Sequence, residues 1–280
     1  MVPESVVATT GAEASLAQNL FRVAGRGAVV TGAGSGLGLA TARVLARNGA
    51  RVTLADVDEA SVQRAAAELT AEGCTVRTAI VDVTDRAAVD ALMAVAAAWD
   101  SGLHVAFANA GISAGPGFVV PEGHLDAVDD DRWQRVLDVN LTGVLHTVRA
   151  AARTMTTGYG RIVVISSLAG IRADPLVGYA YTATKAGVVA LVRNASLELA
   201  PRGILVNAIA PGAFVTNIGS ANPRRAQVVE EFARAAALKR LADPAELEGL
   251  ALFLASPASS YVTGAVLAID GGATTGRNPV

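Results

Sequence analysis

Short apolar runs rich in β-branched residues alternate with longer alanine-rich stretches from Gly27 onward. The short runs are almost continuously apolar, which is typical of strands buried on both faces of a parallel sheet. The longer stretches repeat apolar residues at the three- and four-residue spacing of helices. The pattern predicts strands at residues 27–31, 51–55, 75–81, 103–108, 161–166, 204–209 and 265–269.

Helical spacing is clearest in two stretches, from Leu37 to Leu45 after the first strand and from Val188 to Ala195 before the sixth. Because strands and helices alternate, we predict an α/β fold with a doubly wound parallel sheet of seven strands and helices on both faces. No linker or repeat divides the chain. We therefore expect one domain over residues 21–280, preceded by a flexible arm over residues 1–20 with one helical turn from Leu16 to Phe21.

Composition narrows the function classes. The chain has 280 residues, of which 52% are hydrophobic and 17% charged, and this balance excludes general disorder. A formal net charge of -2 disfavours nucleic acid or an anionic membrane as the main partner. Cys74 is the single cysteine and the three histidines lack zinc-site spacing, so we expect neither a disulfide nor a metal. We find no targeting segment and no apolar run of bilayer length, and expect a cytoplasmic protein.

Four glycines follow the first strand directly, in Thr31-Gly32-Ala33-Gly34-Ser35-Gly36-Leu37-Gly38. Glycine permits positive φ and close backbone approach, and the next helix offers unpaired N–H groups to a phosphate. The spacing is T-G-x-x-x-G-x-G, which is neither G-x-G-x-x-G nor a P-loop. A plain tight turn is the alternative interpretation. The strand before it and the helix after it favour a dinucleotide-binding turn.

Asp56 ends the second strand, about 20 residues after the glycines, where a carboxylate can bind the adenosine ribose. Capping of the next helix is the alternative role. Neither Ser35 nor Val57 supplies a positive charge for a 2′-phosphate, and Asp56 would repel one. The sequence therefore favours NAD over NADP.

Tyr181 is the one tyrosine with a lysine four residues later, and the chain contains two lysines, Lys185 and Lys239. The spacing places Tyr181 and Lys185 on one helix face. An ammonium beside a phenol lowers the tyrosine pKa from about 10 toward neutrality, which suits a general acid or base. An ordinary interface tyrosine beside a solvated lysine is the alternative.

Three other polar residues accompany this pair. Ser167 ends the fifth strand, at the carboxyl edge where ligands bind in open α/β sheets. Asn109 follows the fourth strand, and Asn140 lies on the next long helix. Taken alone, each of these three residues has a purely structural role as its alternative interpretation.

In this order the motifs resemble those of the short-chain dehydrogenase/reductase family, over about Gly27 to Gly272. The resemblance implies a Rossmann-type fold and reversible hydride transfer between nicotinamide and a secondary alcohol or ketone. It assigns catalysis to Asn140, Ser167, Tyr181 and Lys185. It assigns cofactor contacts to Gly32, Ser35, Gly36, Leu37, Gly38, Asp56, Val57, Asp82, Val83, Asn109, Ala110, Gly111, Tyr181, Lys185, Pro211, Gly212, Phe214 and Thr216.

The resemblance also implies individual roles. Tyr181 would exchange the proton, Ser167 would orient the substrate oxygen, and Lys185 would lower the tyrosine pKa and hold the nicotinamide ribose. Asn140 would hold a water that links Lys185 to solvent. Ser167 lies fourteen residues before Tyr181, one more than is common in the family, and we prefer it to Ser166 because x-x-Gly follows it.

Two long connections match the family's substrate-binding segments, with a lid at residues 212–240 facing a wall at residues 112–130. Their apolar residues predict a hydrophobic substrate, and the candidate contacts are Ser113, Phe118, Leu168, Phe214 and Ile218. The family also implies a homotetramer, with a dimer as the alternative, joined through helices at residues 131–155 and 181–200 and the C-terminal segment. Two other functions stay open, a 3-oxoacyl thioester reductase using NADPH and a non-catalytic NAD-binding regulatory protein.

Overall fold

The computed structural model describes residue 16 and residues 18–99, 102–216 and 225–276 of the chain. Within this part, seven parallel strands form one sheet in the order β3-β2-β1-β4-β5-β6-β7. The strands are β1 (Gly27–Thr31), β2 (Arg51–Asp56), β3 (Val76–Ile80), β4 (Leu103–Ala108), β5 (Gly160–Ile165), β6 (Ile204–Pro211) and β7 (Val266–Ile269).

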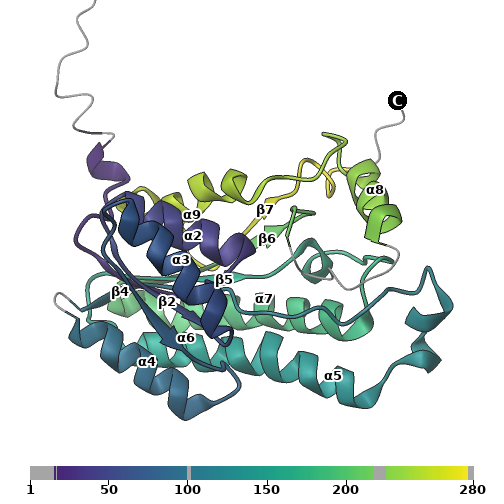
Figure 1. Cartoon of the computed structure of the whole chain (residues 1–280), viewed down its shortest axis with the longest axis horizontal. Helices are drawn as coiled ribbons and strands as arrows, with labels where there is room; N and C mark the ends of the chain where they lie inside the picture. The colour runs from purple at the N-terminus through teal and green to yellow at the C-terminus, as the bar shows by residue number, and fades with distance from the viewer. Residues whose placement is uncertain (1–15, 17, 100–101, 217–224, 277–280) are drawn as a thin grey trace, which may run out of the picture.

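Helices cover both faces of this sheet, α2, α3 and α9 on one face and α4, α6 and α7 on the other (Figure 1). The helices are α2 (Gly36–Arg47), α3 (Glu59–Ala71), α4 (Arg86–Ala98), α5 (Asp130–Leu137), α6 (Gly143–Thr154), α7 (Tyr179–Leu199), α8 (Arg225–Ala235) and α9 (Glu248–Ala255). The predicted doubly wound α/β fold is therefore confirmed.

Strand positions agree closely with the sequence prediction, and the differences lie at strand ends. The sixth strand continues to Pro211, two residues beyond the predicted end, because its last residues pair with β7. The third strand is shorter than predicted, and it lies at the edge of the sheet, where one side of the ladder has no neighbour. Residues 16 and 18–20 are helical, which agrees with the expected turn near Leu16.

The strand order reverses between β1 and β4, and this reversal opens a crevice at their carboxyl ends. The Thr31 hydroxyl donates to the Phe107 carbonyl oxygen at 3.2 Å and accepts from the Asn109 backbone N–H at 3.1 Å. These bonds connect the two strands where they diverge. The glycine turn and Asn109 consequently lie next to each other at the mouth of the crevice.

A π turn, Asp138–Thr142, joins α5 to α6. Such a turn contains one residue more than an α-helical turn, and it is found frequently at functional sites. Asn140 lies in this turn and is completely buried.

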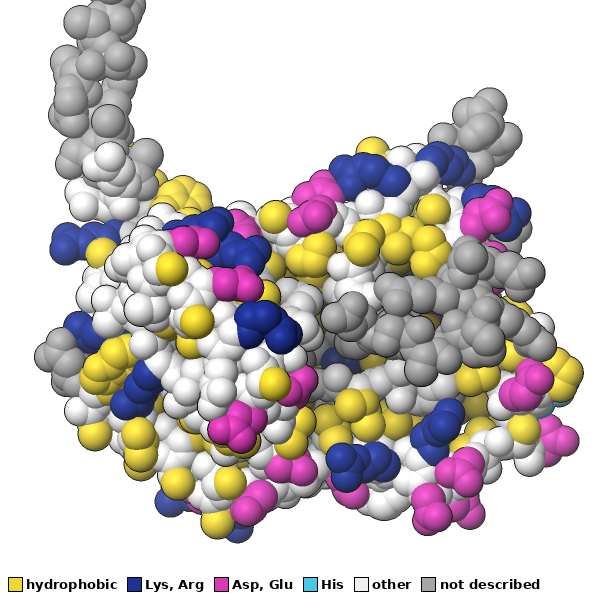
Figure 2. Space-filling view, in the orientation of Figure 1, with side chains coloured by type: hydrophobic (Ala, Val, Ile, Leu, Met, Phe, Trp, Pro, Cys, Tyr) yellow, Lys and Arg dark blue, Asp and Glu magenta, His cyan; other side chains and the backbone are white. Residues whose placement is uncertain are grey.

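Charged side chains of both signs are interspersed over the molecular face shown in Figure 2. That face has no broad field of one sign, in agreement with the small net charge of the chain. Within the described residues, no helix is long and apolar enough to span a membrane.

The core prediction concerns Phe107 of β4, which is fully buried between the sheet and the α2 and α3 layer. Phe107→Ala should reduce the free energy of unfolding by about 3–5 kcal/mol, because it removes buried apolar area and leaves a cavity. Urea unfolding followed by circular dichroism at one fixed protein concentration measures the loss. Val95→Ala, at a position 58% exposed on α4, should change stability by less than about 0.5 kcal/mol. Equal losses in the two variants would contradict this assignment of the core.

Candidate active site

The glycine turn leaves no room for side chains where it meets β4. A Cβ on Gly32, whose φ is +66°, would lie 2.8 Å from the Ala110 Cα. A Cβ on Gly38 would collide with the Gly32 carbonyl oxygen, so the first turn of α2 packs directly on the loop. Gly36 also has positive φ, at +55°, and a Cβ added to it would lie 3.4 Å from the Thr216 methyl group. Both conformations favour glycine and explain the motif.

The N-terminus of α2 is suited to an anion. Ser35 is its N-cap, yet its side chain makes no capping hydrogen bond. By contrast, the side chains of Asp58, Asp85 and Asp129 cap α3, α4 and α5. Free backbone N–H groups at a helix N-terminus bind phosphate, and the bare glycine surface lets a pyrophosphate approach. The residues present therefore fit a dinucleotide.

Asn109 fixes the other side of this turn. Its Nδ2 donates to the Thr31 and Gly32 carbonyl oxygens, each at 3.0 Å. The side chain thus holds the shape of the glycine turn. Ala110 and Gly111 continue the same segment toward Asn140.

Asp56 lies at the position predicted for ribose recognition. Its Oδ2 accepts from the Gly34 N–H at 2.9 Å, and its Oδ1 accepts from the Asp58 N–H at 3.0 Å. Both oxygens keep a further lone pair, which can accept from ribose hydroxyl groups. Asp58, and not Asp56, caps the next helix, α3, because its carboxylate accepts from the Ser61 N–H.

Asp82 and Val83 lie after β3, at the expected adenine position. Asp82 accepts hydrogen bonds from the Thr84 backbone and hydroxyl group, at 2.9 and 2.8 Å, and these bonds lower its pKa. Val83 is buried against Gly143, and its carbonyl oxygen is 3.0 Å from His146 Nδ1. Packing between this loop and α6 therefore defines one wall of the predicted adenine site.

Lys185 is buried below the crevice. Its Nζ donates to the Ile165 carbonyl oxygen at 2.8 Å and lies 5.4 Å from the centre of the Tyr181 ring. Burial lowers the pKa of Lys185 to about 8. Lys185 therefore loses its proton more readily than an exposed lysine does.

The Ser167 side chain lies close enough to the Tyr181 phenol to lower its pKa, which places the two predicted catalytic hydroxyl groups near each other. Burial and the Asp174 carboxylate raise the pKa of Tyr181, and the net shift is upward. The prediction that Lys185 lowers this pKa is wrong for this structure. Desolvation of the phenol dominates, and Lys185 directs a donor to the Ile165 carbonyl oxygen.

Asn140 connects the π turn to the loop after β4. Its Oδ1 accepts from the Ile112 N–H at 2.8 Å, and its Nδ2 donates to the Ile112 carbonyl oxygen at 2.9 Å. A Cβ placed on Gly111 would be 3.3 Å from Asn140 Oδ1 and 3.6 Å from Lys185 Nζ. These distances place Asn140 beside Lys185, as the sequence predicted.

The neighbouring Ser166 has a different role from Ser167. The Ser166 hydroxyl group is buried and donates to the Lys185 carbonyl oxygen at 2.9 Å, which attaches α7 to the end of β5. Ser167 caps the 3₁₀ turn Leu168–Gly170 by accepting from the Ala169 N–H. Tyr179 is 36% exposed, whereas Tyr181 is partly buried. The geometry agrees with the choice of Ser167 and Tyr181.

The segment after β6 packs against β7 and faces the start of α2. Pro211 pairs with Ile269, and the Gly212 N–H donates to the Ile269 carbonyl oxygen at 2.9 Å. The Thr216 methyl group would be 3.4 Å from a Cβ on Gly36, so Thr216 faces the start of α2. Leu37 is the second residue of that helix, and Val57 is exposed beside Asp56.

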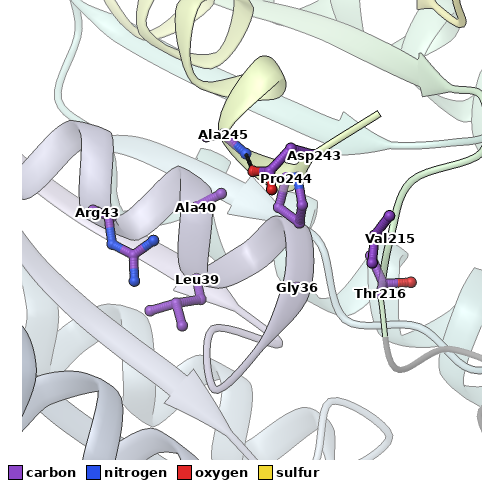
Figure 3. A pocket seen from close by; sticks show the side chains of 9 residues that line it. All are labelled: Gly36, Leu39, Ala40, Arg43, Val215, Thr216, Asp243, Pro244 and Ala245. Atoms are coloured by element: carbon purple, nitrogen blue, oxygen red, sulfur yellow. Dashed lines mark hydrogen bonds between the residues drawn. The ribbon is translucent and has the colours of Figure 1, made fainter. Parts of the chain in front are cut away.

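A cavity of about 290 Å³ lies beside this contact (Figure 3). It is bounded by Leu39 and Ala40 of α2 on one side, by Val215 and Thr216 on the other, and by the turn that begins at Asp243. It borders the predicted pyrophosphate site rather than Tyr181. We locate the chemistry at Tyr181 because the buried ionisable groups converge there.

The predicted substrate contacts fall into two groups. Ser113 and Phe118 lie in the loop before α5, where Phe118 is 48% exposed and its ring centre is 6.4 Å from that of Tyr179. Leu168 and Phe214 are instead buried, Leu168 against Ala236 and Ala273 and Phe214 in the core below β6. The side chains of Leu168 and Phe214 thus belong to apolar clusters of the protein interior. Ile218 lies outside the described residues.

No group of three potential metal ligands occurs within the described ranges. The sequence inspection also missed one site neighbour, Asp174, whose charge acts on Tyr181. It lies in the irregular connection between Ser167 and α7, and neither periodicity nor a motif in the sequence marks it.

The chain is similar to known proteins over most of its length. The family model described as "Enoyl-(Acyl carrier protein) reductase" matches residues 32–274. A cis-4-hydroxycyclohexanecarboxylate dehydrogenase of Sinomonas cyclohexanicum is 44% identical over 89% of this chain and 96% of its own length. An L-tagatose-forming galactitol 2-dehydrogenase of Cereibacter sphaeroides is 40% identical over 92% of this chain and 98% of its own length.

A solved short-chain type dehydrogenase/reductase of Mycobacterium marinum has the same architecture, with a TM-score of 0.84 and 32% identity. The match covers 92% of this chain and 99% of that one. The chain therefore belongs to the short-chain dehydrogenase/reductase family and is an NAD(P)-dependent oxidoreductase of hydroxyl and carbonyl groups.

Proposed function

We propose that this chain is an NAD-dependent dehydrogenase that converts a hydrophobic secondary alcohol reversibly into a ketone. The observation that supports the proposal best is the proximity of Tyr181 to Ser167 and to Lys185, together with the position of Asn140 and Lys185 around Gly111. A non-catalytic regulatory protein would not need all four groups. When bound, nicotinamide supplies the hydride acceptor or donor.

Tyr181 is the proposed general base in alcohol oxidation. Its phenolic oxygen would take the proton of the substrate hydroxyl group, while the Ser167 hydroxyl group binds and orients the same substrate oxygen. In ketone reduction the proton would return along the same path. Lys185 would hold the nicotinamide ribose, and Asn140 would connect Lys185 to solvent through a water molecule.

Asp56 supports a preference for NAD. Its carboxylate is fixed by two backbone N–H groups at the predicted ribose position, where it would accept from ribose hydroxyl groups and repel a 2′-phosphate. The usual cellular cofactor ratios then favour alcohol oxidation as the working direction. A 3-oxoacyl thioester reductase stays a second candidate, because the family model that matches is described as an acyl carrier protein reductase.

Assembly and location complete the proposal. Leu145 of α6 and Leu197 of α7 are apolar and 41% and 79% exposed, which supports burial of these helices in a homotetramer or a dimer. The single cysteine suits the reducing cytoplasm. Residues 212–240 would form the substrate lid of the single domain. Residues 1–15 and 17 of the expected N-terminal arm, and residues 217–224 of this lid, lie outside the described residues.

The catalytic prediction concerns Tyr181→Phe, which removes the proton-transferring hydroxyl group and preserves the ring. The rate of NADH formation should fall by about 10²–10⁴-fold, while NAD binding persists. NADH absorbance is followed with a panel of aliphatic, aryl, terpenoid, sugar and hydroxyacyl alcohols. Tyr261→Phe, at a fully exposed position, is the matched control and should retain full activity. Equal activity of wild type and Tyr181→Phe would contradict the assigned base.

The second prediction concerns pH. Alcohol oxidation needs the deprotonated phenol, and the pKa of Tyr181 is raised, so kcat/KM for oxidation should increase with pH into the alkaline range. Because the Asp174 charge raises that pKa, Asp174→Asn should move the rising limb to lower pH. Steady-state pH profiles measure the shift. Glu68→Gln, an exposed change on α3, should leave the profile in place, and an unmoved limb in Asp174→Asn would refute the electrostatic role.

The third prediction concerns the cofactor. Because a 2′-phosphate would lie beside the Asp56 carboxylate, wild-type protein should bind NADH at least about tenfold more tightly than NADPH, a difference of about 1.4 kcal/mol. Fluorescence titration of both dinucleotides measures the ratio. Tighter binding of NADPH would overturn both the NAD preference and the inferred oxidative direction.

A further inference from the structure

A second polar side chain faces the predicted ribose site beside Asp56. A Cβ built on Gly34 would lie 3.0 Å from Asp56 Oδ2 and also 3.0 Å from the Ser61 Cβ. Gly34 therefore contacts both the end of β2 and the first turn of α3. Ser61 is on the same side of the glycine turn as the carboxylate that selects the ribose.

Ser61 in turn positions an arginine. Arg64, one helical turn later on α3, donates from Nη2 to the Ser61 hydroxyl oxygen at 3.1 Å. The Ser61 hydroxyl group donates to Asp58 Oδ2 at 2.6 Å. The Arg64 guanidinium is therefore hydrogen-bonded to the hydroxyl group of Ser61, the residue that borders Gly34 beside Asp56. Arg64 is exposed, so its other N–H donors can turn toward a ligand.

On this geometry, we infer that Arg64 is a specificity-determining residue that pairs with a phosphate on the ribose 2′-oxygen and so retains part of the affinity for NADP. The inference rests on the proposed function, since it assumes that the adenosine ribose binds at Asp56. An arginine fork matches the oxygens of a phosphate and forms charge-assisted hydrogen bonds with it.

The charges around Arg64 limit how strongly it can attract a phosphate. Asp56 and Ser61 both border Gly34, Asp58 accepts from the Ser61 hydroxyl group, and hydrogen bonds from Ser61 keep the pKa of Asp58 below its usual value. Two carboxylates therefore oppose one guanidinium. NAD stays preferred in the wild type, and removal of the Asp56 charge leaves Arg64 as the nearby partner for a phosphate.

The experiment compares 5′-AMP with adenosine 2′,5′-bisphosphate, which differ by the 2′-phosphate alone, by isothermal titration of the full chain. The proteins are wild type, Asp56→Asn, Arg64→Gln and the double variant, with Arg64→Lys in the Asp56→Asn background as the conservative replacement. Arg47→Gln is the matched control, because Arg47 is an exposed arginine at the far end of α2 and pairs with Glu72.

Asp56→Asn should strengthen binding of the bisphosphate by about tenfold or more. Adding Arg64→Gln should remove about tenfold of that affinity and change 5′-AMP binding by less than about twofold. Arg64→Lys should recover part of the loss, and Arg47→Gln should change neither affinity.

Two results would overturn the inference while the proposed function stands. One is a double variant that binds the bisphosphate as tightly as Asp56→Asn does. The other is an equal loss of affinity for both nucleotides on Arg64→Gln, which would mean that Arg64 only stabilises α3. If neither nucleotide binds wild-type protein, the adenosine site itself is absent, and the proposed function fails together with the inference.

Discussion

The hydrogen bonds between the ends of β1 and β4 are the constraint on which the site depends. Thr31 and Asn109 connect two strands whose helices leave toward opposite faces of the sheet, and Asn109 also holds two carbonyl oxygens of the glycine turn. Without this connection the loop could close over the crevice. The N-terminus of α2 stays accessible because the neighbouring strand, rather than a capping side chain, fixes the turn.

The catalytic groups come from separate elements, and each is oriented by a backbone partner. Lys185 bonds to the end of β5, Ser166 bonds back to the Lys185 carbonyl oxygen, and Asn140 bonds to both polar groups of Ile112. Buried polar groups are costly when unpaired, so these bonds restrict the side chains to few arrangements. The same burial that orients Lys185 lowers its pKa, so position and protonation have one cause.

Much of the fold could be predicted from sequence, because strands buried on both faces are continuous apolar runs whatever their neighbours are. Thr31, Asn109 and Tyr181 could be found because their motifs adjoin strand or helix ends. The direction of the Tyr181 pKa shift could not, since it depends on how much water the folded protein removes from the phenol. Arg64 and Asp174 escaped notice because their contacts arise from tertiary folding. Phe214 and Leu168 were apolar candidates whose burial only the packing reveals.

The π turn also determines the rotational phase of the helices around it. An added residue rotates everything beyond it by about 100° about the helix axis. Val136 before the turn and Val144 and Val148 after it are all buried, although in a regular helix through the same sequence these side chains would point in directions further apart about the axis. Deleting one residue here would regularise the backbone and swing Asn140 away from Ile112. The π turn thus adjusts the rotation of α6 relative to α5, so that the same helical segment packs against the core and holds Asn140 at the site.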